Sequence, residues 1–379
     1  MRTDTTTKAA GLYIHVPFCV SKCAYCNFYS VTTLDLIPSY LAAVKREMSF
    51  YRERFTAVDT VYLGGGTPSI LTGMQLDDLM GIIHETFSVA PGAEITIEAN
   101  PGDCSPDFLG TLRAAGFNRI SIGVQSFDDT LLSFLGRRHS ESDAINAVMN
   151  SRRAGFANIG LDLIYALPGQ NMDHWTATIT KALSFEPEHL SCYELTIEPN
   201  TPLGKQFSAG TLTVPPEDRQ FDFFMTTSEL LEASGYVHYE VSNFARGWDH
   251  VSRHNMKYWR HVPYLGIGPA AHSFLGNQRW WNHRSLHHYL SDIGHGNPPV
   301  SDIEQLGSDE LMTEAIFLGM RTREGIDLDD FYRRFNRNLM EEKGKALKDF
   351  ELQGLITIGR GNVAPTRRGL ALADTLALI

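Results

Sequence analysis

The sequence has no apolar run long enough to span a membrane and no excess of positive charge. A membrane helix needs about 20 consecutive apolar residues, and no stretch of this chain approaches that length. Lys and Arg number 33 against 44 Asp and Glu, a formal net charge of −11, which argues against a general nucleic-acid binder. The opening MRTDTTTKAA also lacks the apolar core of a secretory signal, so we expect residues 1–10 to be a flexible lead-in.

Cysteine is scarce and unevenly placed. The chain has five cysteines, an odd number, and three of them crowd between positions 19 and 26. Secreted proteins stapled by disulfides do not show this pattern, whereas a reducing compartment suits it, so the cytoplasm is the expected location. A hydrophobic content of 43% with 20% charged residues is that of an ordinary soluble globular protein, and 379 residues suffice for one large domain and a smaller one.

Short β-rich segments recur along the first half of the chain and alternate with amphipathic, helix-like stretches. Strands and helices alternating at this spacing predict a parallel sheet built from βαβ units. Six units are too few for an eight-fold barrel, so we predict an α/β fold, a partial (β/α)6 barrel over residues 11–235. The predicted strands are 12–16, 60–63, 94–99, 119–123, 159–164 and 189–196, and the helices between them include 37–55, 75–87, 143–154 and 173–185.

In the remainder of the chain the residue composition and the predicted secondary structure change twice. After a helix at 216–234 comes an aromatic and histidine-rich extension with a polar linker, residues 236–306. Residues 307–379 predict a small winged-helix-like domain, with helices at 308–320, 327–335 and 339–353, a hairpin of 355–358 with 362–365, and a last helix at 366–378. This segment has no dense basic recognition helix, which favours a structural or partner-contact role over binding to nucleic acid.

The three crowded cysteines form the pattern Cys19-x-x-x-Cys23-x-x-Cys26 directly after the first predicted strand. Thiolates are the ligands of iron–sulfur clusters, and three on one short loop can reach three corners of a cubane. The fourth iron would then be open to a substrate or cofactor. The alternatives are loosely buried thiols or a structural zinc ion with His15 as a fourth ligand, although this spacing is not common for zinc. The isolated Cys104 and Cys192 are expected to be plain thiols.

Polar residues stand at the ends of several predicted strands. Glycines in Gly64-Gly65-Gly66-Thr67-Pro68 would let backbone groups approach a ligand closely, at the strand ends where ligands of parallel α/β folds gather. Glu98, Gln125 and Asp162 follow on later strands. A carboxylate in an apolar strand is costly to bury unless it is paired or bound to a ligand. Each could be a satisfied interior group, but together they favour a common binding site.

The stretch GLYIHVPFCVSKCAYCNF resembles the signature of the radical SAM superfamily. It is more narrowly similar to the branch that contains oxygen-independent coproporphyrinogen III oxidase and the HemW family of heme chaperones, from about Leu12 into the C-terminal domain. This resemblance implies a [4Fe–4S] cluster on Cys19, Cys23 and Cys26, whose open iron chelates S-adenosylmethionine (SAM), which reduction cleaves to a 5′-deoxyadenosyl radical. The positions that match SAM contacts of the family are Tyr13, Tyr25, Gly65, Gly66, Thr67, Glu98, Gln125, Arg137 and Asp162.

Two features separate a heme chaperone from an oxidase within this branch. The oxidase pattern has a further cysteine two residues after the third ligand, where this chain has Phe28, a residue that can only pack. The second feature is His254-Asn255-Met256-Lys257-Tyr258-Trp259. Histidine is the commonest axial ligand of heme iron, and aromatic rings offer flat apolar surfaces to a porphyrin. Without further information, however, a histidine near Tyr and Trp is more often a packed surface or core residue. His250, His261 and His272 are likewise expected to be packed surface or core residues.

HN-x-x-YW is similar to the motif that marks the HemW family, which implies that His254 contacts heme. The resemblance favours a heme-binding chaperone without coproporphyrinogen oxidase activity. It implies as partners heme, recipient hemoproteins such as membrane respiratory enzymes, and a second copy of the chain.

Overall fold

The computed structural model describes residues 9–378, which form two compact units. The first unit runs up to Gly160 and includes Asn200–Pro202 and Val262–Gln305. The second unit comprises Leu161–Pro199, Leu203–His261 and the chain from Leu306 onward. The predicted lead-in at 1–10 lies, up to residue 8, outside the described residues, and Ala10 already begins a strand.

The first unit is built on a mixed sheet with β1 in its interior. Parallel pairs join β1 to β2, β2 to β3 and β3 to β4, and β9 lies parallel to β1 on its other side. Beyond β9 the pairs β9–β10, β10–β11 and β11–β12 are antiparallel. The strands are β1 (Ala10–Val16), β2 (Ala57–Gly65), β3 (Ser88–Ala99), β4 (Arg119–Gln125), β9 (Tyr264–Ile267), β10 (His272–Leu275), β11 (Gln278–Asn282) and β12 (Val300–Gln305).

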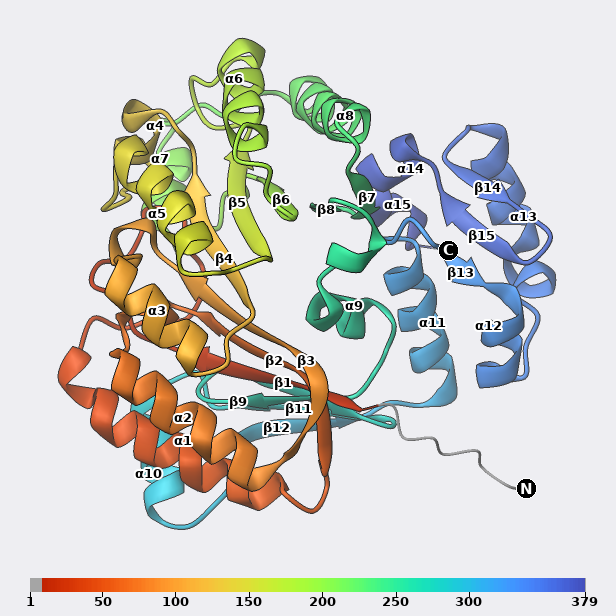
Figure 1. Ribbon diagram of the computed structural model, residues 1–379. Coiled ribbons are helices and arrows are strands. Elements are labelled where there is room, and N and C mark those ends of the chain that lie inside the picture. The colour runs from red at the N-terminus through yellow and green to blue at the C-terminus, as the bar shows by residue number, and fades with distance from the viewer. Residues whose placement is uncertain (1–8, 379) are drawn as a thin grey trace. The chain divides into compact units, whose positions relative to one another are not determined.

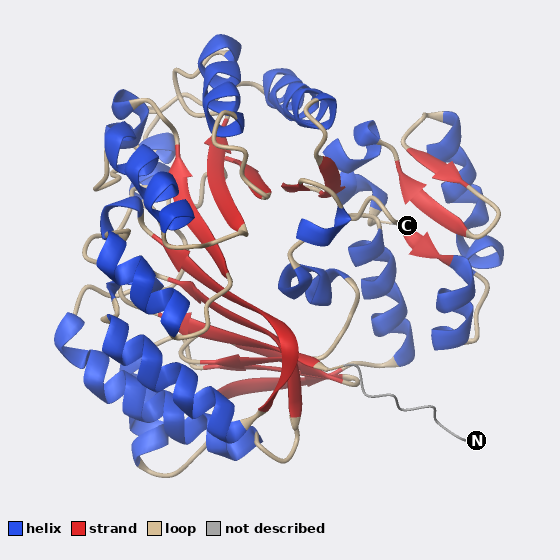
Figure 2. Cartoon of the chain, viewed as in Figure 1, coloured by secondary structure: helices blue, strands red, loops and turns tan. Residues whose placement is uncertain are grey.

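Helices line one side of this sheet, as Figures 1 and 2 show. Neighbours contact one another in the order α10, α1, α2, α3, α5. Two of them begin where the sequence provides a capping box, α2 at Thr72 with Gln75 and α5 at Ser140 with Asp143. The helices of this unit are α1 (Ile37–Tyr51), α2 (Gly73–Thr86), α3 (Pro106–Ala114), α4 (Asp129–Phe134), α5 (Glu141–Arg153) and α10 (Leu286–Gly294), with short 3₁₀ turns η1 (Leu34–Leu36), η2 (Pro68–Ile70) and η3 (Pro101–Asp103).

Side chains alternate along the parallel strands between an apolar and a polar set. On β1, Leu12, Ile14 and Val16 are fully buried, as expected for the face that helices cover. Burying one such aliphatic side chain contributes roughly 1.5–3 kcal/mol. The alternate positions Tyr13 and His15 point to the opposite face, and the polar residues of the neighbouring strands share that face with them.

Residues 262–305 extend this sheet, whereas the sequence analysis predicted that 236–306 would be one extension with a linker. The structure divides that segment at Val262 between the two units. The predicted polar linker contains β12, which pairs with β11 from Asn282↔Val300 to Gln278↔Gln305. The local sequence is polar because β12 is a mostly exposed strand.

A buried carboxylate fastens this extension to α1. Glu47 of α1 is 0% exposed, and its two oxygens accept hydrogen bonds from the Gly268 backbone N–H at 2.8 Å, Asn282 Nδ2 at 2.5 Å and the Tyr289 hydroxyl at 2.6 Å. Burial raises the pKa of Glu47 to about 7, against the opposing effect of these three donors. The network ties α1, β9, β11 and α10 into one block.

The second unit contains β5 (Ile159–Tyr165), which begins at the end of the first unit, and the strands β6 (His189–Glu194), β8 (Asn243–Ala245) and β7 (Val237–Glu240), joined by antiparallel pairs β6–β8 and β8–β7. Trp175 Nε1 donates to Thr227 Oγ1 at 2.8 Å and holds α6 to α8. The helices are α6 (Met172–Leu183), α7 (Pro202–Ser208), α8 (Glu217–Ala233) and α9 (Arg253–Trp259), with the turn η4 (Trp248–His250).

The C-terminal part of this unit has its own apolar core, which includes Ile316, Phe331, Leu347 and Val363. Its sheet has three strands in the order β13-β15-β14, one more than the predicted hairpin, and the predicted last helix is split in two. The elements are α11 (Ser308–Gly319), β13 (Ile326–Asp327), α12 (Leu328–Phe335), α13 (Leu339–Leu352), β14 (Ile356–Ile358), β15 (Asn362–Pro365), α14 (Arg367–Ala371) and α15 (Ala373–Leu376).

Backbone hydrogen bonds attach this C-terminal part to β7 and its turn. The Val241 N–H donates to the Arg321 carbonyl at 3.1 Å, and the Arg323 N–H donates to the Tyr239 carbonyl at 2.9 Å. Side chains of Arg323 and Arg367 also pair with Glu232 of α8. The position of Arg321 is therefore fixed by main-chain bonds. Among residues 9–378, no helix is both long and apolar enough to cross a bilayer.

The Glu47 network generates a pH prediction. The folded-state pKa of about 7 exceeds the ordinary value of 4.5, so the folded protein retains a proton there that the unfolded chain has lost. Stability should therefore fall as pH rises from 4.5 to 7, at up to about 1.4 kcal/mol per pH unit from this group, and not change further above 7. In Glu47→Gln this part of the slope should vanish.

The measurement is the urea midpoint of the full chain at a series of pH values. Glu53→Gln, a change at an exposed carboxyl just beyond the same helix, is the matched control and should keep the wild-type slope. An unchanged slope in Glu47→Gln would contradict the assignment.

Candidate functional site

The cysteine loop leaves the end of β1 and is held in place by backbone hydrogen bonds. The Cys19 N–H donates to the Val31 carbonyl at 3.0 Å, and the Val31 N–H donates to the Pro17 carbonyl at 2.7 Å. Between them Phe18 is fully buried and packs edge-on against Tyr40 of α1, with ring centroids 5.3 Å apart. Both ends of the loop are thus anchored, and Cys23 and Cys26 lie between them.

The loop presents three free thiols, each partly exposed, and two of them accept hydrogen bonds at sulfur. Thr67 Oγ1 donates to Cys19 Sγ at 3.3 Å, and the Arg137 guanidinium donates to Cys23 Sγ at 3.5 Å. Burial is the largest cause of a raised pKa at the Cys26 thiol. Donors aimed at sulfur stabilise thiolates and tune the clusters that they ligate, so these side chains fit an iron–sulfur cluster.

The zinc alternative depended on His15, and the geometry does not support it. His15 Nδ1 is hydrogen-bonded to the Tyr13 hydroxyl at 3.1 Å and Nε2 to the Tyr29 carbonyl at 2.9 Å, so both ring nitrogens are engaged. Burial lowers the pKa of His15 to about 4, which keeps the ring neutral.

The glycine turn after β2 lies against the start of the cysteine loop. Gly65 has a φ of +108°, and a Cβ there would approach the His15 ring to 2.5 Å. A Cβ on Gly66 would come within 2.7 Å of the Phe18 carbonyl oxygen, and the N–H groups of Gly66 and Thr67 donate to the Val16 and Phe18 carbonyls at 2.8 Å. Only glycine permits this close approach of two backbones.

Glu98 of β3 is held by this turn and by a tyrosine on the same sheet face. The Gly65 N–H donates to its Oε2 at 3.2 Å, and the Tyr62 hydroxyl donates to its Oε1 at 2.9 Å. Tyr62 pairs in register with Tyr13, whose ring centroid lies 6.2 Å away. The structure therefore brings Tyr13, the glycine turn and Glu98 together on one face of the sheet.

Gln125 and Arg137 meet over Gly123 at the end of β4. Gln125 is buried with a φ of +65°, an uncommon conformation for a residue with a side chain. A Cβ on Gly123 would lie 3.1 Å from Gln125 Nε2 and 3.3 Å from an Arg137 terminal nitrogen, which donates to the Gly123 carbonyl at 2.7 Å. Arg137 also neighbours Tyr25, whose pKa burial raises strongly. The buried Nε of Arg137 has no hydrogen-bond partner, a feature that suits a bound ligand.

Sequence reasoning missed the residues that support the far end of the loop. The Leu286 N–H at the start of α10 donates to the Tyr29 hydroxyl at 2.7 Å, and Arg284, just before that helix, donates to the Asn27 carbonyl at 3.2 Å. The partners are more than 250 residues apart in the chain, so no local signal links them. Phe28 itself is 67% exposed and does not pack in the core, unlike the expectation from sequence.

Asp162 belongs to β5 in the second unit. It lies near Cys192 of β6, and its charge adds to burial in raising the pKa of that thiol. Cys104, in the first unit, is 4% exposed, and burial raises its pKa to about 12. Both isolated cysteines are buried.

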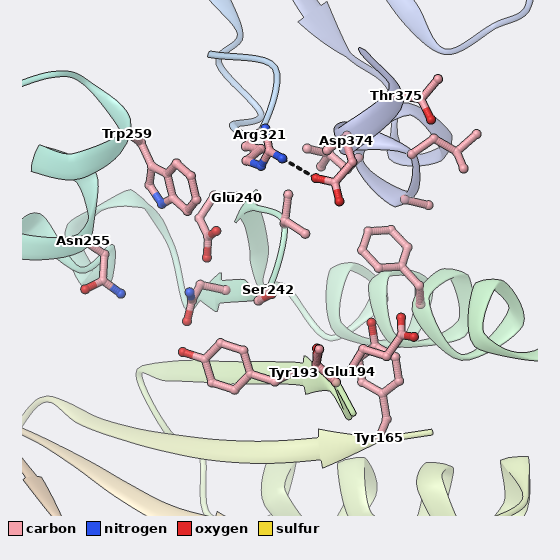
Figure 3. A pocket seen from close by; sticks show the side chains of 18 of the residues that line it. Tyr165, Tyr193, Glu194, Glu240, Ser242, Asn255, Trp259, Arg321, Asp374 and Thr375 are labelled. Carbon is pink, nitrogen blue, oxygen red and sulfur yellow. Dashed lines mark hydrogen bonds and ion pairs between the residues drawn. The ribbon is translucent and has the colours of Figure 1, made fainter. Parts of the chain in front are cut away.

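A cavity of about 740 Å³ lies within the second unit (Figure 3). Its walls come from the ends of β5 and β6, the β7–β8 turn, α9 and the α14–α15 segment. Aromatic side chains are prominent: Tyr165, Tyr193, Phe224, Tyr258 and Trp259. Tyr193 is 41% exposed. The remaining lining residues are Glu194, Thr196, Glu240, Val241, Ser242, Asn243, Asn255, Arg321, Leu370, Ala371, Leu372, Ala373, Asp374 and Thr375.

Polar atoms in the wall of this cavity lack partners. Glu240 is 2% exposed and Asn243 5%, and Glu240 Oε1 and Asn243 Oδ1 are buried without a hydrogen bond. Burial raises the pKa of Glu240 to about 7, and that of Glu194 also rises by burial. Arg321 pairs with Asp374 at the cavity, as the dashed line in Figure 3 marks. Buried polar atoms without partners are rare and point to a bound ligand or water.

The predicted heme motif reaches the cavity, but its histidine does not line it. Asn255, Tyr258 and Trp259 of α9 are lining residues, whereas His254 is absent from the lining and only 1% exposed. His254 Nε2 is hydrogen-bonded to the Tyr258 hydroxyl at 2.8 Å, with the two rings edge to face.

The three neighbouring histidines, His250, His261 and His272, make contacts within the protein and do not line the cavity. His261 pairs with Glu314 at 3.0 Å, and His272 stacks on Trp281 with ring centroids 5.6 Å apart. His250 ends the turn η4.

The fold and the cysteine loop together define a radical SAM protein. Residues 13–182 match the radical SAM superfamily and residues 306–372 the HemN C-terminal domain. The solved structure of coproporphyrinogen III oxidase (HemN) from Escherichia coli, a radical SAM enzyme, aligns with 99% of this chain and 91% of its own at a TM-score of 0.87. At 23% identity this likeness shows the fold alone, the predicted α/β radical SAM fold with a C-terminal domain.

Closer relatives narrow the family. The heme chaperone HemW of Bacillus subtilis is 35% identical over 367 residues, covering 96% of each chain. That of Mycobacterium tuberculosis is 35% identical over 359 residues, 93% of this chain and 92% of the relative. The chain belongs to the HemW family, and the resemblance predicted from the sequence is confirmed.

The glycine turn generates a prediction for SAM. Gly65→Ala places a Cβ at the His15 ring and strains the positive φ, which should displace the backbone that holds Glu98. We expect SAM affinity to fall at least about tenfold while the visible absorption of the cluster is kept.

Calorimetric titration of SAM into anaerobically reconstituted protein measures this effect. Gly81→Ala on α2, where a Cβ meets nothing within 4 Å, is the control and should bind SAM like wild type. Wild-type affinity in Gly65→Ala would remove the turn from the SAM site.

Proposed function

We propose that this protein is a cytoplasmic heme chaperone, which binds heme in the cavity of the second unit and delivers it to recipient hemoproteins. The observation that carries this proposal is the cavity itself, because three residues of the HN-x-x-YW motif line it. The relatives that are 35% identical over more than nine-tenths of the chain are named heme chaperones, which supports the same function.

The chemistry of the cavity suits a porphyrin. Its volume of about 740 Å³ is in the range of cofactor pockets, roughly 300–1,000 Å³. Rings of Tyr193, Trp259 and Phe224 supply flat apolar surfaces for a large planar ligand. Arg321 is the basic side chain in the lining, and its guanidinium could exchange Asp374 for a heme propionate in a bidentate ion pair.

The first unit would hold a [4Fe–4S] cluster on Cys19, Cys23 and Cys26. Such a cluster supplies an electron and an open iron for SAM. Thr67 and Arg137 would donate hydrogen bonds to the ligand sulfurs. The glycine turn, Glu98, Gln125, Tyr13 and Tyr25 would bind SAM. The family resemblance alone gives Asp162, on β5, the same role. The buried Nε of Arg137 is a free donor for the SAM carboxylate.

The alternative, oxygen-independent coproporphyrinogen III oxidase, is less favoured. Phe28 stands where the oxidase pattern has a cysteine, and its exposed ring cannot take over the chemistry of a thiol. The likeness to HemN concerns the fold, which a carrier and a catalyst can share. Membrane respiratory enzymes as recipients and a second copy of the chain as partner rest on the family resemblance alone.

A paired assay tests the proposal. Anaerobically reconstituted protein should bind about one equivalent of ferric heme per chain and form no protoporphyrinogen from coproporphyrinogen III in the presence of SAM and a reductant. Heme titration by absorption and product analysis by chromatography on the same preparation measure both.

Protein from which the cluster has been removed is the control for background conversion. Product formation above that control would establish the oxidase instead. Failure to bind a stoichiometric amount of heme would exclude the chaperone.

A further inference from the structure

α9 places a phenol and an imidazole in contact at the wall of the cavity. His254 and Tyr258 are four residues apart, one turn of helix, so they lie on the same face. Their side chains meet at 2.8 Å between His254 Nε2 and the Tyr258 hydroxyl. The tyrosine is half-buried and lines the cavity, while the histidine behind it is buried and does not.

This order of contact decides which side chain can reach a ligand. An occupant of the cavity meets Tyr258 first, and the Nε2 of His254 is already bonded to the tyrosine oxygen. Tyrosine is one of the established protein ligands of heme iron, and its phenolate is a hard anion that favours the ferric state. A neighbouring imidazole is a suitable acceptor for the proton that the phenol must lose.

We propose that Tyr258 coordinates ferric heme iron in the cavity and that His254 acts through it as a positioning residue. On binding, the Tyr258 O–H bond breaks, its proton moves to His254 Nε2, and the phenolate oxygen forms a bond to iron(III). No electron is transferred. The resulting imidazolium donates a hydrogen bond back to the phenolate oxygen and holds it. This inference rests on the proposed heme-binding function and specifies how the same site works.

The cavity itself gives independent support for a ligand. Glu240 Oε1 and Asn243 Oδ1 are buried acceptor oxygens without hydrogen-bond partners in its wall, a feature that suits a bound ligand with a donor group or a metal ion. Glu240 is also the main competitor of Tyr258 as an oxygen ligand. The tyrosine differs from it in having a proton acceptor already in place.

Resonance Raman and absorption spectra of the full chain titrated anaerobically with ferric heme test the inference. The wild-type complex should show the vibrations of an iron-bound phenolate, a readout that needs no variant. In Tyr258→Phe these bands should vanish and the dissociation constant should rise at least about tenfold. His254→Gln should retain the phenolate bands with weaker binding, because glutamine can still hydrogen-bond the tyrosine. In His254→Ala affinity should fall further while the absorption of the cluster stays intact.

Tyr332→Phe, on α12 and 55% exposed, is the matched control and should bind heme as wild type does. Glu240→Gln lies in the cavity and removes the competing oxygen ligand, so it should retain the phenolate bands whatever its affinity for heme. A wild-type complex without phenolate bands, or a Tyr258→Phe protein with the wild-type spectrum and affinity, would overturn the inference and leave the chaperone function standing. Absence of stoichiometric heme binding by wild type would instead overturn the proposed function, and the inference with it.

Discussion

The strict alternation of side chains along parallel strands is the constraint on which the site in the first unit depends. Because neighbouring strands are in register, each strand contributes residues of one parity to the polar face, where Tyr13, Tyr62 and Glu98 meet. The residues of the other parity are apolar and buried. A shift of one residue in any pair would exchange the two sets, bury the polar ones beneath the helices and expose the apolar ones. The core and the site therefore determine each other.

Local sequence was sufficient for the strands that follow this alternation. The predicted 119–123 is observed as Arg119–Gln125 and the predicted 159–164 as Ile159–Tyr165, because an apolar run bounded by turn residues specifies a buried strand without distant information. Strands β9–β12 are different. They are short, and β9 is positioned by pairing with β1, which lies about 250 residues earlier in the chain. No local pattern encodes such a partner.

Glu47 shows the same limit for a single residue. In an amphipathic helix a glutamate is expected to face solvent, yet this one is fully buried, since donors 221, 235 and 242 residues later in the chain close around it. The cysteine loop, in contrast, was predictable from three residues and their spacing. Its supports were not, because Tyr29 and Arg284 are ordinary residues until the fold brings their segments together. Motifs identify the groups that do chemistry, whereas the groups that hold them are visible only in three dimensions.

The heme motif shows a further difference between composition and geometry. Histidine is the commonest axial ligand of heme iron, and for that reason the sequence prediction assigned heme contact to His254. On α9 the histidine stands behind the tyrosine, and the distance between them is set by the helix rather than by the identity of either residue. An α-helix turns roughly 100° per residue, so one residue inserted between them would keep every letter of the motif and carry the phenol away from the imidazole. When sequences of relatives are compared, the four-residue interval between the histidine and the tyrosine is therefore the feature that matters. A chain with both residues at another spacing lacks the contact between them.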